Sequence, residues 1–337
     1  MKKILITGGL GFLGSYSIEK FKKHNYQITV IDNLSSNAIY PNDKICENVK
    51  IIIKDILDYN WETESEKFDI ILHLASPVGP VGILKYSGRM AEYILDDIYW
   101  AIKGAQKNNC PLIFISTSEI YGYRDKPELL KEEDDKLLVG DFKVRNEYSI
   151  AKLLSEIVLS NTSKVSNLKY QIIRPFNISG ARQLPNGGFV LPTFVTQAIS
   201  NQDITVFNTG DQIRAFTHVT DIVDGIYLIS TTNKLNEIWN IGNDKNQSTI
   251  NYMAKKTHEI VNSDSKIIHI DPKLIHGNLY EEAWDKIPNS DKIINQLGWS
   301  PKWDTDSIIN DVIEYYKNIE NWKLINNKNE NTILNNS

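Results

Sequence analysis

Thr7-Gly-Gly-Leu-Gly-Phe-Leu-Gly14 follows directly on the short apolar run Ile4-Leu5-Ile6. The run predicts a buried strand, and the glycines predict a tight turn that leads into a helix. Gly8 permits a positive φ, Gly11 lets the backbone approach a ligand, and Gly14 lets the helix pack closely on the sheet. The amides at the helix start carry partial positive charge, which favours a phosphate. The stretch predicts a dinucleotide site, although its Gly-x-x-Gly-x-x-Gly spacing also suits an ordinary strand-to-helix turn.

The next predicted strand, Gln27 to Ile31, ends in Asp32. An acidic side chain there accepts hydrogen bonds from the adenosine ribose and repels a 2′-phosphate, so the sequence predicts NAD rather than NADP. Asp55 and Ala75-Ser76 follow further strands, although Asp55 could equally be a plain loop residue. The residues predicted to contact the cofactor are Gly8, Gly11, Phe12, Leu13, Gly14, Asp32, Asn33, Asp55, Ile56, Leu74, Ala75, Ser76, Tyr148, Lys152 and Pro175.

Strand-like and helix-like segments alternate through the first half of the chain, which predicts a doubly wound parallel α/β sheet of the Rossmann type. A smaller α/β C-terminal substrate domain is expected over 177–325, with 1–176 as the NAD-binding domain and 213–242 returning to it. The tail over 326–337 is expected to be disordered. The predicted strands are Lys3–Thr7, Gln27–Ile31, Val49–Lys54, Ile70–Leu74, Leu112–Ser116 and Tyr170–Arg174, and the predicted helices are Phe12–His24, Arg89–Asn108 and Arg145–Asn161.

Composition narrows the class of protein. The chain has 337 residues, of which 41% are hydrophobic and 23% charged, with a net charge of −5. Mixed charges without a basic stripe give little support for a nucleic-acid partner, and no apolar run reaches the roughly 18 residues of a membrane helix. Cys46 and Cys110 form neither a disulfide framework nor a metal-ligand cluster, so we expect no metal and a reducing, cytoplasmic location.

Tyr148 and Lys152 lie four residues apart in a helical pattern and therefore share one face. A tyrosine with a pKa of about 10 is a poor base at neutral pH. We expect the lysine ammonium and a cationic nicotinamide to lower that pKa, so that the phenolate takes a hydroxyl proton while hydride leaves the same carbon. The same spacing also occurs on solvated helix faces, and only its combination with the glycine turn favours catalysis.

The segment Ser116-Thr117-Ser118-Glu119 follows the fifth predicted strand and so lies at the active edge of the sheet. Thr117 can donate a hydrogen bond to the reacting oxygen. Glu119 could serve as a second acid or base, or could be a surface carboxylate.

Together these motifs resemble those of the extended short-chain dehydrogenase/reductases, in the group of nucleotide-sugar epimerases, dehydratases and decarboxylases. The resemblance runs from Lys3 to about Tyr316. The segments that carry it are TGGLGFLG, Asp32, Asp55, His73-Leu74-Ala75, STSEIYG, YSIAK, Arg174-Pro-Phe-Asn177 and Arg214-Ala-Phe-Thr-His-Val-Thr-Asp221.

The resemblance implies an NAD-dependent enzyme that keeps and recycles its cofactor, with Thr117, Tyr148 and Lys152 as the catalytic set beside Ser118 and Glu119. It implies a nucleoside-diphosphate sugar as substrate, and a homodimer formed by the helices near 89–108 and 145–161. Arg214 could neutralise the diphosphate and Phe207 could stack on the base; alone they would be interpreted as a surface arginine and a core aromatic. The implied substrate contacts are Asn177, Val190, Leu191, Phe207 and Arg214.

Relatives of this kind oxidise a sugar hydroxyl, usually at C4, and differ in the fate of the resulting ketone. A 4-epimerase is the simplest interpretation. Ser118 in place of the usual aspartate counts against 4,6-dehydration. The Thr-Ser-Glu form and Phe176-Asn-Ile-Ser-Gly-Ala-Arg182 resemble UDP-glucuronate decarboxylases, but Asp285-Lys-Ile-Pro-Asn-Ser-Asp291 lacks the arginine that is common there. A simple dehydrogenase or reductase and a non-catalytic NAD sensor remain further alternatives, the latter disfavoured because both Tyr148 and Lys152 are present.

Overall fold

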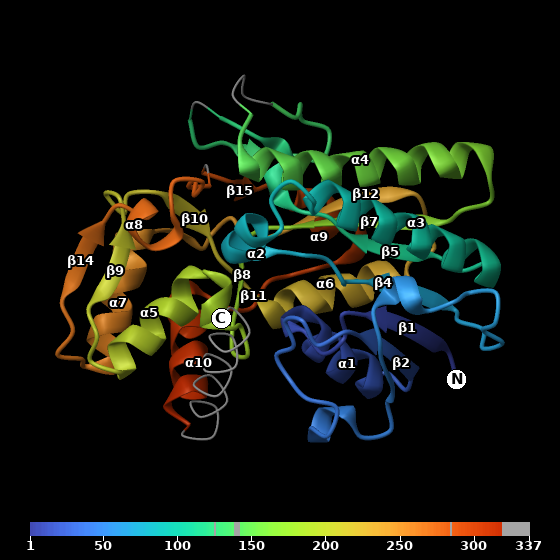
Figure 1. Ribbon diagram of the computed structural model, residues 1–337, viewed down its shortest axis with the longest axis horizontal. Coiled ribbons are helices and arrows are strands. Elements are labelled where there is room, and N and C mark those ends of the chain that lie inside the picture. The colour runs from blue at the N-terminus through green and yellow to red at the C-terminus, as the bar shows by residue number, and fades with distance from the viewer. Residues whose placement is uncertain (125, 138–141, 284, 319–337) are drawn as a thin grey trace.

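Seven parallel strands form the central sheet of the protein. The computed structural model describes residues 1–124, 126–137, 142–283 and 285–318, so the tail predicted to be disordered lies outside the described residues. The sheet order is β12-β7-β5-β4-β1-β2-β3 (Figure 1), and every neighbouring pair is parallel. The strands are β1 (Lys3–Thr7), β2 (Gln27–Asp32), β3 (Lys50–Ile53), β4 (Ile70–His73), β5 (Leu112–Ile115), β7 (Tyr170–Pro175) and β12 (Glu237–Ile241). The predicted fold class is confirmed, and the predicted strand bounds differ from the observed ones by one residue at most at each end.

Helices cover both faces of this sheet, because its strands are apolar on both sides. One face packs against α1 (Phe12–Lys23) and α6 (Val219–Thr231) around Phe21 and Ile226. The other packs against α3 (Met90–Asn108) and α4 (Val144–Val165) around Ile98 and Leu159. The chain order reverses between β1 and β4, which places a ligand-binding crevice at the carboxyl ends of these strands.

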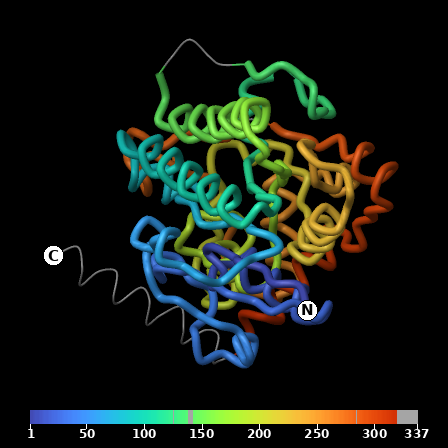
Figure 2. Tube along the Cα trace, turned by 90° about the vertical axis from the view of Figure 1, so that its right-hand side faces the viewer, coloured from blue at the N-terminus to red at the C-terminus, as the bar shows by residue number. Residues whose placement is uncertain are grey.

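A second, smaller lobe lies beside the sheet, at the left of Figure 1. Its core joins α5 (Val190–Ile199), α7 (Ile250–Val261) and α10 (Thr305–Lys317) to the parallel pair β9 (Ile204–Phe207) and β14 (Ile267–Ile270). Figure 2, turned by 90°, shows the blue amino-terminal segments at the bottom of the molecule and the light-green helix α4 at the top. β12 and α6 lie with the large sheet although their sequence follows the first part of the small lobe.

The remaining elements are short. They are η1 (Lys44–Cys46), η2 (Ile56–Asp58), α2 (Gly79–Lys85), η3 (Ser118–Tyr121), β6 (Leu129–Leu130), β8 (Ile178–Ser179), η4 (Pro185–Gly187), β10 (Ile213–Ala215), β11 (Thr217–His218), β13 (Gln247–Thr249), α8 (Lys273–His276), β15 (Ile287–Pro288) and α9 (Asp291–Leu297). Within the described residues, no helix has both the length and the apolar composition needed to cross a membrane.

Candidate active site

The glycine turn has the backbone that its sequence predicts. Gly8 has a φ of +65°, and its amide donates to the Ile31 carbonyl at 2.8 Å. A Cβ at Gly14 would lie 2.3 Å from the Gly8 carbonyl oxygen, so only glycine permits this approach. Gly11 is the N-cap of α1, and no side chain caps it. The first turn of α1, which contains Phe12 and Leu13, therefore leaves its amides to a phosphate group, as a bound dinucleotide requires.

The acidic residue at the end of β2 is held by the turn itself. Asp32 accepts hydrogen bonds from the amides of Leu10 at 2.9 Å and Leu34 at 2.8 Å. Burial raises the pKa of Asp32, and these two amides partly offset the shift. Beside it, the Asn33 amide donates to Asp55 at 3.0 Å. Three of the predicted cofactor contacts therefore lie together at one side of the crevice.

Asp55 also caps the short helix η2, because its carboxylate accepts from the Leu57 amide at 3.0 Å. Ile56 is buried behind it. Asp55 therefore orders the loop after β3 and joins it to Asn33.

The loop after β4 is fixed by a buried hydroxyl. Thr7 Oγ1 accepts from the amides of Leu74 and Ala75, both at 3.1 Å, and lies 2.9 Å from His73 Nδ1. Burial, with a smaller contribution from Lys152, lowers the pKa of His73 to about 3, so this histidine is neutral. Ser76 follows at the mouth of the loop, and Pro175 ends β7.

The predicted catalytic hydroxyls meet. Thr117 lies two residues after the end of β5 and is the N-cap of η3. Its hydroxyl oxygen accepts from the Glu119 amide at 3.2 Å, and the same hydroxyl forms a hydrogen bond with the Tyr148 side chain. The Tyr148 ring is 4% exposed and packs against Ile83 and Met90 from α2 and α3. Burial raises the pKa of Tyr148, and the Thr117 hydrogen bond offsets only part of this. The protein alone therefore holds a neutral phenol, which differs from the lowering expected from Lys152.

Lys152 is buried on the same helix, and its ammonium donates to the Ile115 carbonyl at 3.0 Å. Burial lowers the pKa of Lys152 to about 8, against the opposing effects of Asp97 and Glu156. The lysine is therefore charged at neutral pH but close to losing its proton. It lies at the end of β5, which is where the sequence predicts the nicotinamide end of the cofactor.

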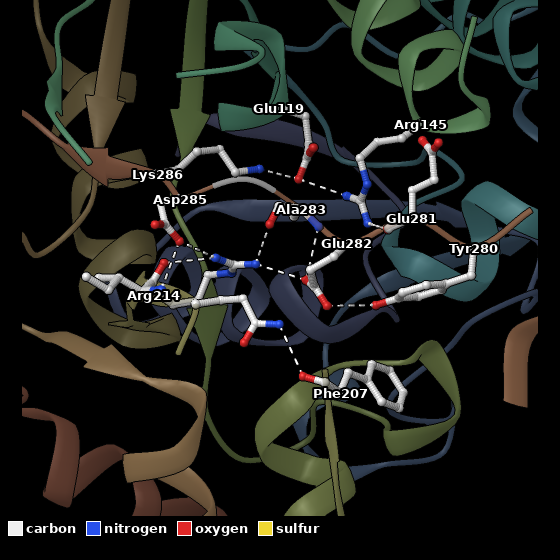
Figure 3. A network of polar contacts seen from close by, with 12 residues as sticks. Glu119, Arg145, Phe207, Arg214, Tyr280, Glu281, Glu282, Ala283, Asp285 and Lys286 are labelled. Atoms are coloured by element: carbon white, nitrogen blue, oxygen red, sulfur yellow. Dashed lines mark hydrogen bonds and ion pairs between the residues drawn. The ribbon is translucent and has the colours of Figure 1, made fainter. Parts of the chain in front are cut away.

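A charged cluster joins Glu119 to two cations from distant parts of the chain (Figure 3). Lys286, just before β15, forms an ion pair and hydrogen bond with Glu119 Oε1, and Arg145 Nη1 from the first turn of α4 reaches the same oxygen at 3.1 Å. The side chains of Lys286, Arg145 and Glu119 are 3%, 10% and 14% exposed. Two cations therefore face one carboxylate in a largely water-free place. Arg145 lies three residues before Tyr148, and Glu119 lies two residues after Thr117.

The two cations keep Glu119 negatively charged. Burial alone would raise the pKa of Glu119, but Lys286 and Arg145 outweigh burial and lower it to about 2. Burial lowers the pKa of Lys286 to about 8. Among the described residues, Glu119 Oε2 and Arg145 Nε are buried without a hydrogen-bond partner. Since such orphaned atoms are costly, the cluster is suited to receive a further polar group.

Residues predicted to contact the substrate lie around the small lobe. Asn177 has a φ of +34° and donates to the Ala215 carbonyl at 3.3 Å. Val190 is partly buried at the start of α5, while the Leu191 side chain is 1% exposed in the lobe's core. The Leu191 side chain therefore stabilises the lobe, and only its backbone could meet a ligand. Phe207, at the end of β9, forms edge contacts with His276 and Tyr280.

Arg214 is neither exposed nor unpaired. It lies on β10 with a side chain 7% exposed, and it forms ion pairs with Glu282 at 2.9 Å and Asp285 at 3.3 Å. The interpretation as a surface arginine is therefore wrong. Its two acidic partners are more exposed than the arginine, Glu282 at 30% and Asp285 at 32% (Figure 3).

The comparisons with known proteins agree with this geometry. The model of the NAD dependent epimerase/dehydratase family matches residues 4–242, more than half of the chain. The chain belongs to that family. It is an NAD-dependent enzyme, and the predicted family, fold, cofactor and general function are confirmed.

Individual relatives differ in the reaction that their names state. The chain is 31% identical to a UDP-N-acetyl-alpha-D-glucosaminuronate decarboxylase of Bacillus cytotoxicus, over 95% of this chain and 99% of that protein. It is 28% identical to a dTDP-D-glucose 4,6-dehydratase of Bos taurus, over 96% and 91% of the two chains. Among solved structures, the UDP-glucose 4-epimerase of Thermotoga maritima superposes with a TM-score of 0.82 at 25% identity, covering 94% of this chain and 98% of that one.

Three residues in and around the charged cluster were not predicted from the sequence: Arg145, Lys286 and Glu282. Arg145 stands three residues before Tyr148, so its helical spacing was an available signal. Lys286 was not singled out because the expected residue was an arginine. No sequence pattern points to Glu282, whose contact with Arg214 joins residues 68 positions apart. Within the described residues, no group of three or more possible ligands could hold a metal ion.

Proposed function

We propose that the protein decarboxylates a UDP-linked uronic acid through transient oxidation at C4, rather than acting as the 4-epimerase that the motifs favoured. The observation that carries this proposal is the pair of buried cations, Lys286 and Arg145, beside Thr117 and Tyr148. A substrate carboxylate at C6 would need such cations, whereas a neutral sugar would not. The similarity to a uronate decarboxylase over nearly the whole chain supports it.

The expected cofactor site fits a dinucleotide, since the uncapped start of α1, the Gly14 close contact and Asp32 all remain available to it. When bound, NAD takes a hydride from the sugar and later returns it. A cationic nicotinamide beside Tyr148 would lower the pKa of its phenol. The resulting phenolate accepts the O4 proton as the ketone forms, and Thr117 donates a hydrogen bond to that oxygen. Lys152 holds positive charge at the end of β5, next to the predicted nicotinamide ribose.

The ketone at C4 makes the substrate a β-keto acid. The C5–C6 bond then breaks, carbon dioxide leaves, and the electron pair becomes an enolate on O4, which the Thr117 and Tyr148 hydroxyls stabilise. A proton from solvent adds at C5. Tyr148 returns its proton to O4 when the ketone is reduced again, a step for which the bound cofactor would supply the hydride. In this proposal Lys286 and Arg145 orient the carboxylate before it leaves, and Glu119 keeps both cations in place. Lys286 thus occupies the role for which an arginine was expected from the sequence.

The substrate side of the proposal uses the remaining contacts. The small lobe, which lies within the segment 177–325 predicted to be the substrate domain, binds the substrate, with Arg214 binding the diphosphate and Phe207 beside the base. Asn177 and the backbone of Val190 and Leu191 line the sugar and nucleotide. Ser118, buried next to Thr117, is assigned no proton transfer.

Product analysis tests the reaction. Purified protein is incubated with NAD and UDP-N-acetylglucosaminuronate or UDP-glucuronate labelled with ¹³C at C6, and products are followed by NMR. We expect labelled carbon dioxide and a UDP-pentose, and loss of both in Lys286→Met with recovery in Lys286→Arg. A C4 epimer that keeps its labelled carboxylate would instead establish the epimerase. No turnover of either compound would overturn the decarboxylase.

A homodimer in the cytoplasm completes the proposal. Ile150, Leu154 and Ile157 form an exposed apolar stripe along α4, and Tyr99 lies exposed on the neighbouring α3. Such a stripe is typical of a helix that packs against another subunit. Ile157→Glu should convert the dimer to a monomer in light scattering, whereas Leu274→Glu, an equally apolar change on α8, should not; a monomeric wild type would contradict the dimer. Cys46 and Cys110 are free and buried, which suits a reducing compartment.

A further inference from the structure

Both terminal nitrogens of the Arg214 guanidinium form polar contacts within the protein, and most of these contacts come from one acidic segment. We call this segment, residues 279–283 and 285, the acidic strap. Nη2 donates to Glu282 Oε1 at 2.9 Å and to the Ala283 carbonyl at 2.7 Å, and Nη1 lies 3.3 Å from Asp285 Oδ1 (Figure 3). Nη1 also donates to the Ile213 carbonyl at 2.9 Å. A phosphate can reach these nitrogens only if one of the contacts is given up.

Asp285 belongs to the fixed part of this arrangement. Its Oδ1 also accepts from the Ile213 amide at 2.9 Å, and the next residue, Lys286, forms a β-bridge with Arg214. Removing Asp285 from Arg214 would therefore break the backbone pairing that positions Lys286. Asp285 is a structural partner of the arginine.

Glu282 has no such anchor. Its side chain is 30% exposed, and its other partners are the adjacent Ala283 amide at 3.0 Å and the Tyr280 hydroxyl at 3.2 Å, both in the strap itself. The strap begins after Gly277, which has a φ of +78° and open space around it. The neighbouring backbone is held by the Ala283 carbonyl contact with Arg214 and by the Glu281 carbonyl, which accepts from Arg145 at 3.0 Å. Glu282 can therefore leave Arg214 by rotation of its side chain alone, which gives up the ion pair and the hydrogen bonds from Ala283 and Tyr280.

We propose that Glu282 is an internal stand-in for the substrate diphosphate: it holds Arg214 in the free protein and releases it when a nucleoside diphosphate binds. This inference rests on the proposed function, which assigns Arg214 to the diphosphate. A phosphate that binds Arg214 must then displace the Glu282 carboxylate, which offsets part of the attraction between Arg214 and the phosphate. Glu282 lowers the affinity for phosphate-bearing ligands, does not affect a neutral nucleoside, and so selects ligands that carry more negative charge than a carboxylate.

Calorimetric titration of UDP and of uridine separates this role from a structural one. Glu282→Gln keeps the size of the side chain but removes its charge. We expect it to bind UDP about two- to fivefold more tightly than the wild type, the range for loss of one competing ion pair, with uridine affinity unchanged. Glu281→Gln is the matched control, because that carboxylate lies on the same strap but pairs with Lys143 at 3.6 Å. It should leave both affinities unchanged.

Unchanged or weaker UDP binding by Glu282→Gln would overturn the inference, as would an equal gain in Glu281→Gln, which would indicate a general charge effect. A wild type that binds no UDP would remove Arg214 as a diphosphate site and this inference with it. The expected UDP and uridine result in a protein that releases no carbon dioxide from UDP-uronates would support the stand-in and reject the proposed reaction.

Discussion

The two ends of the crevice are built in different ways. The cofactor end is a continuous piece of chain, β1 to α1, in which backbone amides and the absence of side chains do the binding. The substrate end is an assembly of charged side chains from η3, α4, β10 and the segment before β15. The first end suits the cofactor that the family uses. The second end can vary one charge at a time, and we propose that the choice of reaction lies there.

We expect the largest effect from a substitution of Tyr148, whose hydroxyl lies between the cofactor end and the substrate end. Tyr148→Phe keeps the ring that packs against Ile83 and Met90 but loses the proton acceptor. Turnover should fall by about a thousandfold or more, within the range for a lost acid–base group, while bound NAD, measured in the purified protein, stays at the wild-type level. A variant that keeps a tenth of wild-type turnover would contradict the assignment of Tyr148.

The pH dependence examines the substrate end and the nicotinamide end together. Lys152 and Lys286 both have a pKa of about 8, so both are charged below that pH and both lose charge above it. Their loss of charge should lower kcat/KM above about pH 8, by about tenfold per pH unit for each lysine that must be charged. This fall opposes the rise that is expected as the Tyr148 phenol loses its proton.

In Lys286→Arg the guanidinium stays charged, while Lys152 and Tyr148 are unchanged. The ratio of the wild-type rate to the variant rate should therefore fall by about tenfold per pH unit above pH 8. Rates measured between pH 6 and 10 on both proteins make the comparison. A ratio that stays level to pH 10 would show that the Lys286 ammonium is not needed.

The difference between the two ends also explains what the sequence could predict. Gly8, Gly14 and Asp32 are close in sequence and act through local geometry, so their pattern predicts the site directly. The seven-stranded sheet follows from apolar runs of the same local kind. The Glu119–Lys286 contact joins residues 167 positions apart, and nothing local in either segment signals it. The paired state of Arg214 could not be predicted either, because Glu282 reaches it only through the fold.

A smaller effect is expected from filling the close contact at the cofactor end. A Cβ at Gly14 would lie 2.3 Å from a backbone oxygen, so Gly14→Ala should lower the free energy of unfolding by about 1–3 kcal/mol. It should weaken NAD binding and leave UDP binding unchanged. Gly82→Ala on α2 has open space around it and should be neutral or slightly stabilising, by at most about 1 kcal/mol. Calorimetric unfolding of the three proteins measures both changes, and equal losses in the two variants would contradict the close contact.

We propose above all that Lys286, together with Arg145, binds a carboxylate of the substrate. UDP-glucuronate and UDP-glucose differ at C6 by that carboxylate, and Lys286→Met removes the ammonium without adding a polar group. Titration of both ligands into wild type and variant measures the coupling between the two charges. We expect Lys286→Met to bind UDP-glucuronate at least about tenfold more weakly than the wild type, a loss of about 1.4 kcal/mol, and to bind UDP-glucose less than about twofold more weakly. Equal losses for the two ligands would contradict it.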